Sequence, residues 1–141
     1  MDAIGRLKLL TDQMHLEHAE DTKPGCLSPI VSFSNKQRNA AFVHPAKLPN
    51  GGSIQLLKTL LTSACERNCY YCPFRAGRDF RRATFKPEEF ASLFMNLHRA
   101  KAAEGIFLSS GVAGGGVRTQ DGLLDTADIL RHKLGFKGYI H

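Results

Sequence analysis

Three closely spaced cysteines carry the strongest chemical signal in this 141-residue sequence. Cys65, Cys69 and Cys72 stand in the stretch C-E-R-N-C-Y-Y-C-P, directly after a mostly apolar run over residues 53–62. Three thiolates on one short loop can converge on a single iron–sulfur cluster. Because most [4Fe–4S] clusters take four cysteines, a triplet leaves one iron open to another ligand. The spacing therefore favours a [4Fe–4S] cluster with one open iron position.

Two other uses of the same cysteines stay open on spacing alone. Structural zinc prefers four ligands in closely spaced pairs, so Cys26 or a histidine would have to complete the set. A ferredoxin-type run would need a fourth cysteine near the triplet, and the sequence has none there. The alternatives are a zinc-stabilised nucleic-acid-binding module and a simple iron–sulfur electron carrier. We expect Cys26 itself to be an ordinary thiol rather than a ligand.

The elements around the cysteines alternate between strand and helix patterns. Residues 53–62 fit a buried strand and residues 64–84 a long loop. A helix opens at Pro87, a second strand covers residues 106–108, a second helix runs over residues 120–134, and a third strand starts at Phe136. Strands that alternate with helices pair in parallel through crossover connections. The sequence thus predicts an α/β fold with about three parallel strands and two crossover helices, as in part of a (β/α) barrel or an open parallel sheet.

The sequence changes character at residue 52, where a segment rich in proline and glycine gives way to a mostly apolar run. Residues 1–52 form an N-terminal extension with a helix over residues 3–19 and an irregular segment, and residues 53–141 form the α/β core. Because a three-stranded parallel piece leaves bare edges, we expect the chain to be a fragment or one part of a larger assembly.

The formal net charge is +6, and residues 53–104 hold +4 of it. The arginines between residues 67 and 82 form a basic cluster, which can attract nucleic acid or a phosphorylated substrate, or can simply be a solvated loop. Phe74 and Phe80 alternate with these arginines. We expect the two rings to close the loop onto the core rather than to stack on a base.

Composition excludes several classes of protein. Hydrophobic residues make up 43% of the chain, which excludes a disordered or low-complexity protein. No apolar run reaches the roughly 18–20 residues that a membrane span requires, and the N-terminus lacks the pattern of a signal peptide. Four cysteines are too few for a disulfide scaffold. We therefore expect a cytoplasmic protein without membrane contact.

The cysteine motif resembles the signature of radical S-adenosylmethionine (SAM) enzymes. In that signature an aromatic residue precedes the last cysteine, and Tyr71 occupies this position here. The stretches over residues 82–89, 105–112 and 135–141 are similar to one subfamily, described as DNA modification and repair radical SAM proteins. The resemblance covers residues 53–141 and extends more loosely over residues 6–26. It implies a partial barrel of the radical SAM type.

The resemblance also implies roles for individual residues. The three cysteines of the motif would ligate three irons of the cluster, and SAM would bind the fourth iron through its amino and carboxylate groups. Tyr71 would lie against the adenine of SAM. Ser109, Ser110 and Gly111 occupy the place where many members carry a Gly-Gly-Glu stretch that holds the SAM amino group. The sequence has no glutamate there.

The implied chemistry is the one-electron cleavage of SAM to methionine and a 5′-deoxyadenosyl radical, which abstracts hydrogen from a substrate. A low-potential donor of the flavodoxin or ferredoxin type would supply the electron, and the subfamily makes nucleic acid a candidate substrate. Members of the family continue with more barrel elements and, in this subfamily, a C-terminal helix-hairpin-helix segment. We therefore expect this chain alone to lack a complete active site.

Overall fold

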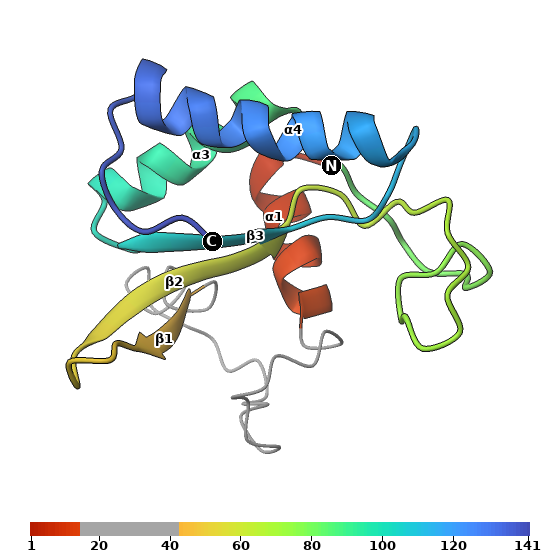
Figure 1. Cartoon of the computed structure of the whole chain (residues 1–141), viewed down its shortest axis with the longest axis horizontal. Coiled ribbons are helices and arrows are strands. Elements are labelled where there is room, and N and C mark those ends of the chain that lie inside the picture. The colour runs from red at the N-terminus through yellow and green to blue at the C-terminus, as the bar shows by residue number, and fades with distance from the viewer. Residues whose placement is uncertain (15–42) are drawn as a thin grey trace.

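The computed structural model describes residues 1–14 and 43–141, which form a small α/β protein (Figure 1). Its last helix continues directly into one π-helical turn over Ile129–Lys133. The elements, in chain order, are α1 (Ala3–Gln13), β1 (Val43–Lys47), β2 (Ser53–Leu60), α3 (Pro87–Arg99), β3 (Gly105–Ser109) and α4 (Gly116–Asp128).

The sheet is mixed and has the order β1-β2-β3. β2 and β3 are parallel, as predicted, and Leu57 lies opposite Ile106. The third strand of the sheet is β1, which was not predicted; it lies on the other side of β2 from β3 and runs antiparallel to β2. Pro45 gives the β1 sequence an irregular appearance, but an edge strand tolerates a proline. The strand predicted after Phe136 is reduced to one parallel bridge, between Ile106 and Ile140.

The helices follow the predicted apolar patterns at most positions. Phe90 and Phe94 of α3 are fully buried, as their spacing predicts. α4 begins at Gly116, four residues earlier than expected. The apolar pattern of this helix predicts that Leu124 faces inward, but Leu124 is 58% exposed and Thr126 is buried. The helix predicted over residues 3–19 is observed to residue 13, and residues 15–19 lie outside the described part.

The fold needs glycine at two positions, one because of its backbone conformation and one because a side chain has no room there. Gly135 has a φ of 69° and follows the π-helical turn, where a left-handed residue ends a helix, as expected. α3 ends before Lys101, which has a φ of 57°, so Gly105 does not end that helix. Gly105 instead opens β3, where a Cβ would lie 2.7 Å from a methyl group of Leu56.

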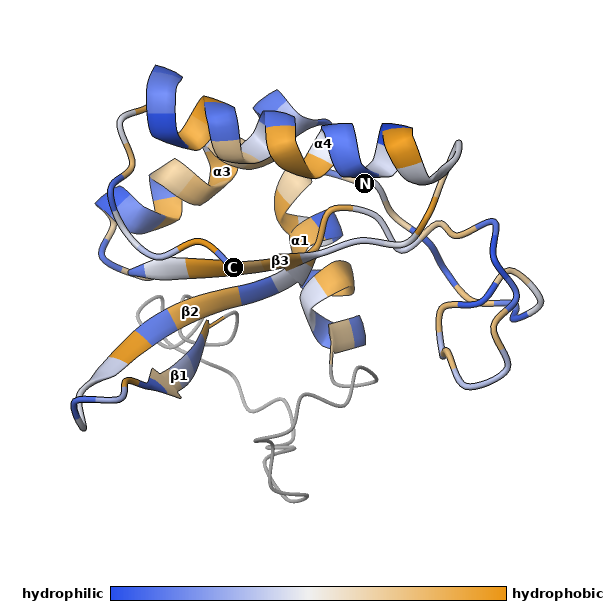
Figure 2. Cartoon of the chain, in the orientation of Figure 1, coloured by the Kyte–Doolittle hydropathy of each residue, from blue (hydrophilic) through white to orange (hydrophobic). Residues whose placement is uncertain are grey.

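One hydrophobic core joins the sheet to its helices. α3 and α4 lie side by side on one face of the sheet, and α1 packs against β2 (Figure 1). Hydrophobic residues recur along β2 and β3 in Figure 2. Leu7, Leu10 and Met14 of α1 belong to the same buried cluster as Leu57 and Phe90. Both parts of the predicted division at residue 52 therefore contribute to this core.

In the part of the chain that the structure describes, no helix has the length and apolarity needed to cross a membrane. Cys26 lies outside the described residues, and so do residues 30–33, whose apolar sequence allows a short strand.

Candidate cysteine site

Residues 63–82, here called the cysteine loop, project from the carboxyl end of β2 (Figure 1). The two ends of the loop are joined at a narrow neck. Thr62 and Thr84 form an antiparallel bridge, and their hydroxyl oxygens are 2.6 Å apart. The Ser63 N–H donates to the Ala83 carbonyl at 3.0 Å, and the Ala83 N–H donates to Ser63 Oγ at 3.0 Å. The neck therefore extends the pairing of the sheet beyond β2 and fixes where the loop begins and ends.

Hydrogen bonds within the loop place Cys69 and Cys72 on one turn. The Ala76 N–H donates to the Arg67 carbonyl at 2.7 Å, so the outgoing and returning halves of the loop lie next to each other. Between these two residues the Cys72 N–H donates to the Cys69 carbonyl at 3.1 Å. The chain reverses within the Cys-x2-Cys segment, which brings the backbones of its two cysteines close together.

Phe74 anchors the returning half of the loop in the core. It is only 5% exposed, and its ring centroid is 6.1 Å from that of the half-buried Phe80. This packing confirms the expectation that the two aromatic residues close the loop onto the body. Tyr70 and Tyr71, by contrast, are 94% and 91% exposed. The contact expected between Tyr71 and an adenine stays a prediction.

The three thiols of the motif are free cysteines. Cys65 and Cys72 are half-buried and Cys69 is exposed, so each can be reached from solvent. Soft sulfur donors of this kind suit iron–sulfur clusters and zinc, and the donor set therefore fits the cluster that the motif predicts. Among residues 1–14 and 43–141, however, no three His, Cys, Asp or Glu side chains are gathered closely enough to hold a metal ion.

The segment after β3 lies against the start of the cysteine loop. The Leu61 N–H donates to the Ser109 carbonyl at 2.8 Å, and the Gly111 N–H donates to the Thr62 carbonyl at 2.8 Å. These bonds continue the parallel pairing of β2 with β3 past the ends of both strands. The residues that the resemblance assigns to SAM are thereby brought next to the neck from which Cys65 follows.

Gly111 makes the closest of these approaches. A Cβ on this residue would lie 2.3 Å from the carbonyl oxygen of Ala64, the residue before Cys65. Any side chain here would push the two loops apart, so the contact requires a glycine. The hydroxyl of Ser110 donates to the Gly111 carbonyl at 2.8 Å, which occupies that donor within its own segment.

Glu66 adds a second connection that the sequence did not reveal. Its backbone N–H donates to the Val112 carbonyl at 2.7 Å, and its carboxylate accepts hydrogen bonds from the N–H groups of Gly114 and Gly115 at 3.2 Å each. A carboxylate at the start of α4 also lies at the positive end of the helix dipole. The available signal was the glycine run before α4, because the N-cap residue Gly115 has no side chain of its own with which to cap the helix.

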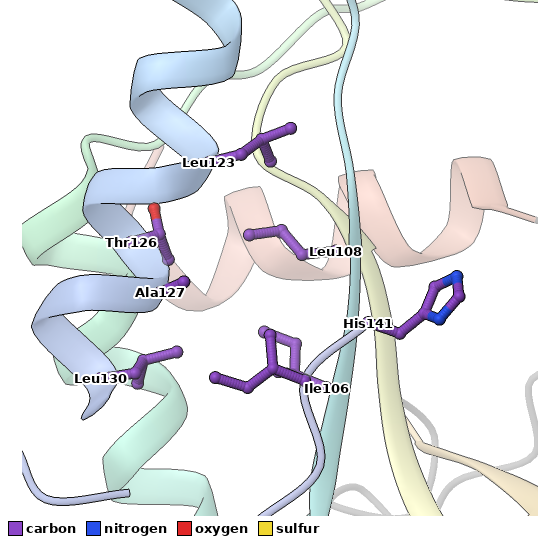
Figure 3. A pocket seen from close by; sticks show the side chains of 8 residues that line it. Ile106, Leu108, Leu123, Thr126, Ala127, Leu130 and His141 are labelled. Carbon is purple, nitrogen blue, oxygen red and sulfur yellow. The ribbon is translucent and has the colours of Figure 1, made fainter.

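A separate pocket of about 190 Å³ lies between α4 and the edge of the sheet (Figure 3). Its lining is largely apolar. The hydroxyl of Thr126 already donates to the Gly122 carbonyl at 2.8 Å, and the His141 ring points away from the space in Figure 3. Nothing in the lining supplies reactive chemistry, so the cysteine loop remains the candidate site. The lining residues are Ile106, Leu108, Leu123, Thr126, Ala127, Leu130, Ile140 and His141.

Comparison with known proteins does not assign this chain to a family. No family model, no curated protein and no solved structure matches it. The resemblance to radical SAM enzymes therefore rests on the residues of the motif and of the stretches that follow it.

Proposed function

We propose that this chain holds a [4Fe–4S] cluster through Cys65, Cys69 and Cys72 and binds SAM beside it, as a radical SAM enzyme or the N-terminal part of one. When bound, the cluster and SAM together supply a 5′-deoxyadenosyl radical that abstracts hydrogen from a substrate. The function is proposed for the cysteine loop and for the segment after β3 that lies against its neck.

One observation carries the proposal. The segment over residues 109–112 and the start of the cysteine loop are joined by backbone hydrogen bonds, from Gly111 to Thr62 and from Glu66 to Val112. The two parts of the motif that would hold the cluster and SAM are about 40 residues apart in sequence but adjacent in space. Such a pairing at the carboxyl ends of parallel strands is the usual place for a ligand in α/β folds.

The residues of the chain have distinct parts in this proposal. The three cysteines supply thiolates to the cluster. The segment after β3 would contact the amino acid part of SAM in place of the missing glutamate, with the hydroxyl oxygens of Ser109 and Ser110 as hydrogen-bond acceptors for the SAM amino group. Tyr71, which is exposed in the structure, would cover the adenine. Gly111 keeps this segment close to Cys65, because it allows the contact with Ala64.

We propose further that β2, α3, β3 and α4 are the opening units of a parallel (β/α) barrel. Support comes from the parallel pairing of β2 with β3 and from the parallel bridge between Ile106 and Ile140 on the other side of β3. Each crossover between neighbouring strands contains one helix, as a repeated β-α unit requires. In the proposed enzyme, a flavodoxin- or ferredoxin-type protein donates the electron, and nucleic acid is the candidate substrate.

Anaerobic reconstitution with iron and sulfide tests the cluster. We expect uptake of about four irons and four sulfides per chain, with an electron paramagnetic resonance signal after reduction that changes when SAM is added. Ser substitutions of Cys65, Cys69 and Cys72, made one at a time, are expected to lower the iron content sharply. Cys26→Ser is the matched control and is expected to retain the cluster.

Three results would contradict the proposal in different ways. A colourless protein with one tightly bound zinc would favour the zinc module. A cluster whose resonance signal does not respond to SAM would favour a simple electron carrier. Loss of iron in Cys26→Ser equal to that in the three loop variants would show that the ligands are wrongly assigned.

A further inference from the structure

The guanidinium of Arg82 binds four backbone carbonyls of the cysteine loop. Its Nη1 donates to the carbonyls of Ser63 and Phe74 at 2.6 and 2.9 Å. Its Nη2 donates to the carbonyls of Arg75 and Arg78 at 2.8 and 3.1 Å. One side chain thus connects the first residue of the loop to three residues in its returning half.

The position of this guanidinium is itself fixed. Its central carbon lies 4.1 Å from the centroid of the Phe80 ring, in a cation–π contact. Phe80 in turn packs on the buried Phe74. The backbone on the other side is held at the neck, where Ala83 exchanges two hydrogen bonds with Ser63. Arg82 is therefore half-buried and restrained from both directions.

In the sequence, all three cysteines of the motif lie between the first of these carbonyls and the other three. Ser63 lies two residues before Cys65, and Phe74 lies two residues after Cys72. The Arg75 N–H also donates to the Cys72 carbonyl at 3.4 Å. Any change in the spacing between Ser63 and residues 74–78 would therefore change where the cysteine turn lies relative to Cys65.

We propose that Arg82 is the positioning residue of the cysteine loop, holding its two halves together so that a movement of the turn between them brings the three thiols onto one ligand. The identity of that ligand as an iron–sulfur cluster rests on the proposed function. A ligand that binds a preorganised loop loses less free energy in ordering the chain, so fixing the halves in advance favours uptake.

The geometry selects arginine over lysine. A guanidinium presents five N–H donors in a planar fork, and here its two terminal nitrogens each serve two carbonyls. The ammonium of a lysine has three donors on a single nitrogen and cannot serve two pairs of acceptors at once. We therefore expect Arg82→Lys to keep the charge but to keep only some of the hydrogen bonds to the loop carbonyls.

Hydrogen exchange of the metal-free protein, followed by mass spectrometry, tests the proposal directly. In Arg82→Gln, amides over residues 64–78 are expected to exchange about tenfold faster, which corresponds to the net loss of one to two hydrogen bonds. Exchange in β2, β3 and α3 is expected to stay the same. Arg82→Lys is expected to give an intermediate rate, and the exposed neighbour variant Arg81→Gln is expected to match the wild type.

Unchanged exchange over residues 64–78 in Arg82→Gln would overturn the proposal. So would an equal increase throughout the sheet, since that would mean general destabilisation rather than positioning, or an equal effect of Arg81→Gln. If Arg82→Gln does not fold, the same comparison between Arg82→Lys and the control decides the question.

Reconstitution then separates this inference from the proposed function. We expect Arg82→Gln to take up less iron than Arg81→Gln, and Arg82→Lys to hold a cluster whose resonance signal differs from that of the wild type. If the wild-type chain takes up no cluster, the proposed function fails, whereas the exchange measurements still report on the loop. If iron uptake is normal in Arg82→Gln although exchange is faster, the positioning role is wrong.

Discussion

Replacing Gly111 by alanine should break the contact between the cysteine loop and the segment after β3. The added Cβ would lie 2.3 Å from the Ala64 carbonyl oxygen and 3.2 Å from that of Thr62. Close carbon–oxygen contacts are about 3.3–3.6 Å, so one backbone has to move by roughly 1 Å. Because both neighbours are main-chain atoms, a side-chain rotation cannot relieve this clash.

The size of the effect follows from the clash and the hydrogen bonds near it. Overpacking of this kind costs about 1–3 kcal/mol, and the loss of the bond from Gly111 to Thr62 costs about 1 kcal/mol more. We therefore expect Gly111→Ala to lower the free energy of unfolding by about 2–4 kcal/mol, a large part of the roughly 5–15 kcal/mol of an ordinary domain. Urea denaturation measures this change, and hydrogen exchange should show faster exchange at the Glu66 amide.

Gly116→Ala is the matched control for this prediction. Nothing lies within 4 Å of a Cβ at Gly116, and the residue opens α4. An alanine there is expected to be neutral or to stabilise the chain by up to about 1 kcal/mol. Equal denaturation midpoints for Gly111→Ala and the wild type would refute the close approach of the two loops.

Three further predictions concern other parts of the molecule. The hydrogen bonds of Arg6 hold the pKa of Glu89 below its ordinary value of 4.5, so the pair stabilises the fold above that pH, and this stabilisation is lost as the pH falls through the lowered pKa. Glu89→Gln should therefore lower the free energy of unfolding by about 1 kcal/mol at pH 7. In acid denaturation curves, the difference between this variant and the wild type should vanish at low pH. Gly135→Ala should lower the stability by about 1 kcal/mol in urea, because a φ of 69° strains an alanine. The double variant of Arg78 and Arg81 to Gln should weaken binding to single-stranded DNA and reduce the slope of log affinity against log salt by about 1.4.

Each of these predictions has a control on the same kind of residue. Glu88→Gln removes an equal charge from the same turn of α3, and an equal loss of stability at pH 7 would contradict the role of the ion pair with Arg6. Gly116→Ala is again the control for Gly135→Ala. Lys133→Gln changes an exposed charge in the π-helical turn that follows α4, and if it lowers the salt slope as much as one arginine does, binding is not directed by the loop.

The sequence predicted the elements that depend on local patterns. The apolar run of β2, the Pro87 start of α3 and the left-handed Gly135 were each indicated by residue types within a few positions. The parallel pairing of β2 with β3 follows from the helix between them. Phe74 and Phe80 were expected to close the loop, and they do, because buried aromatic rings amid charged residues have few other places to pack.

Features that depend on distant partners were missed. The sequence of β1 gives no sign that Val43 lies opposite Leu57, since the pairing depends on a turn and on an edge position that tolerates Pro45. Arg82 was grouped with the other arginines as part of a basic surface, although it binds backbone carbonyls inside the loop. Backbone acceptors have no sequence signature, so composition alone could not separate Arg82 from Arg81.

The two ends of the cysteine loop differ in how firmly they are held. The start of the loop is fixed by Gly111, by Val112 and by the glycines that bind the Glu66 carboxylate. The turn that carries Cys69 and Cys72 is held by Arg82, by Phe74 and by hydrogen bonds within the loop. A ligand that gathers the three thiols therefore has to move only the turn around Cys69 and Cys72, which lies between the segments that Arg82 holds, toward Cys65. On this argument, metal uptake should alter exchange mainly over residues 68–73 and leave the neck and residues 74–78 unchanged.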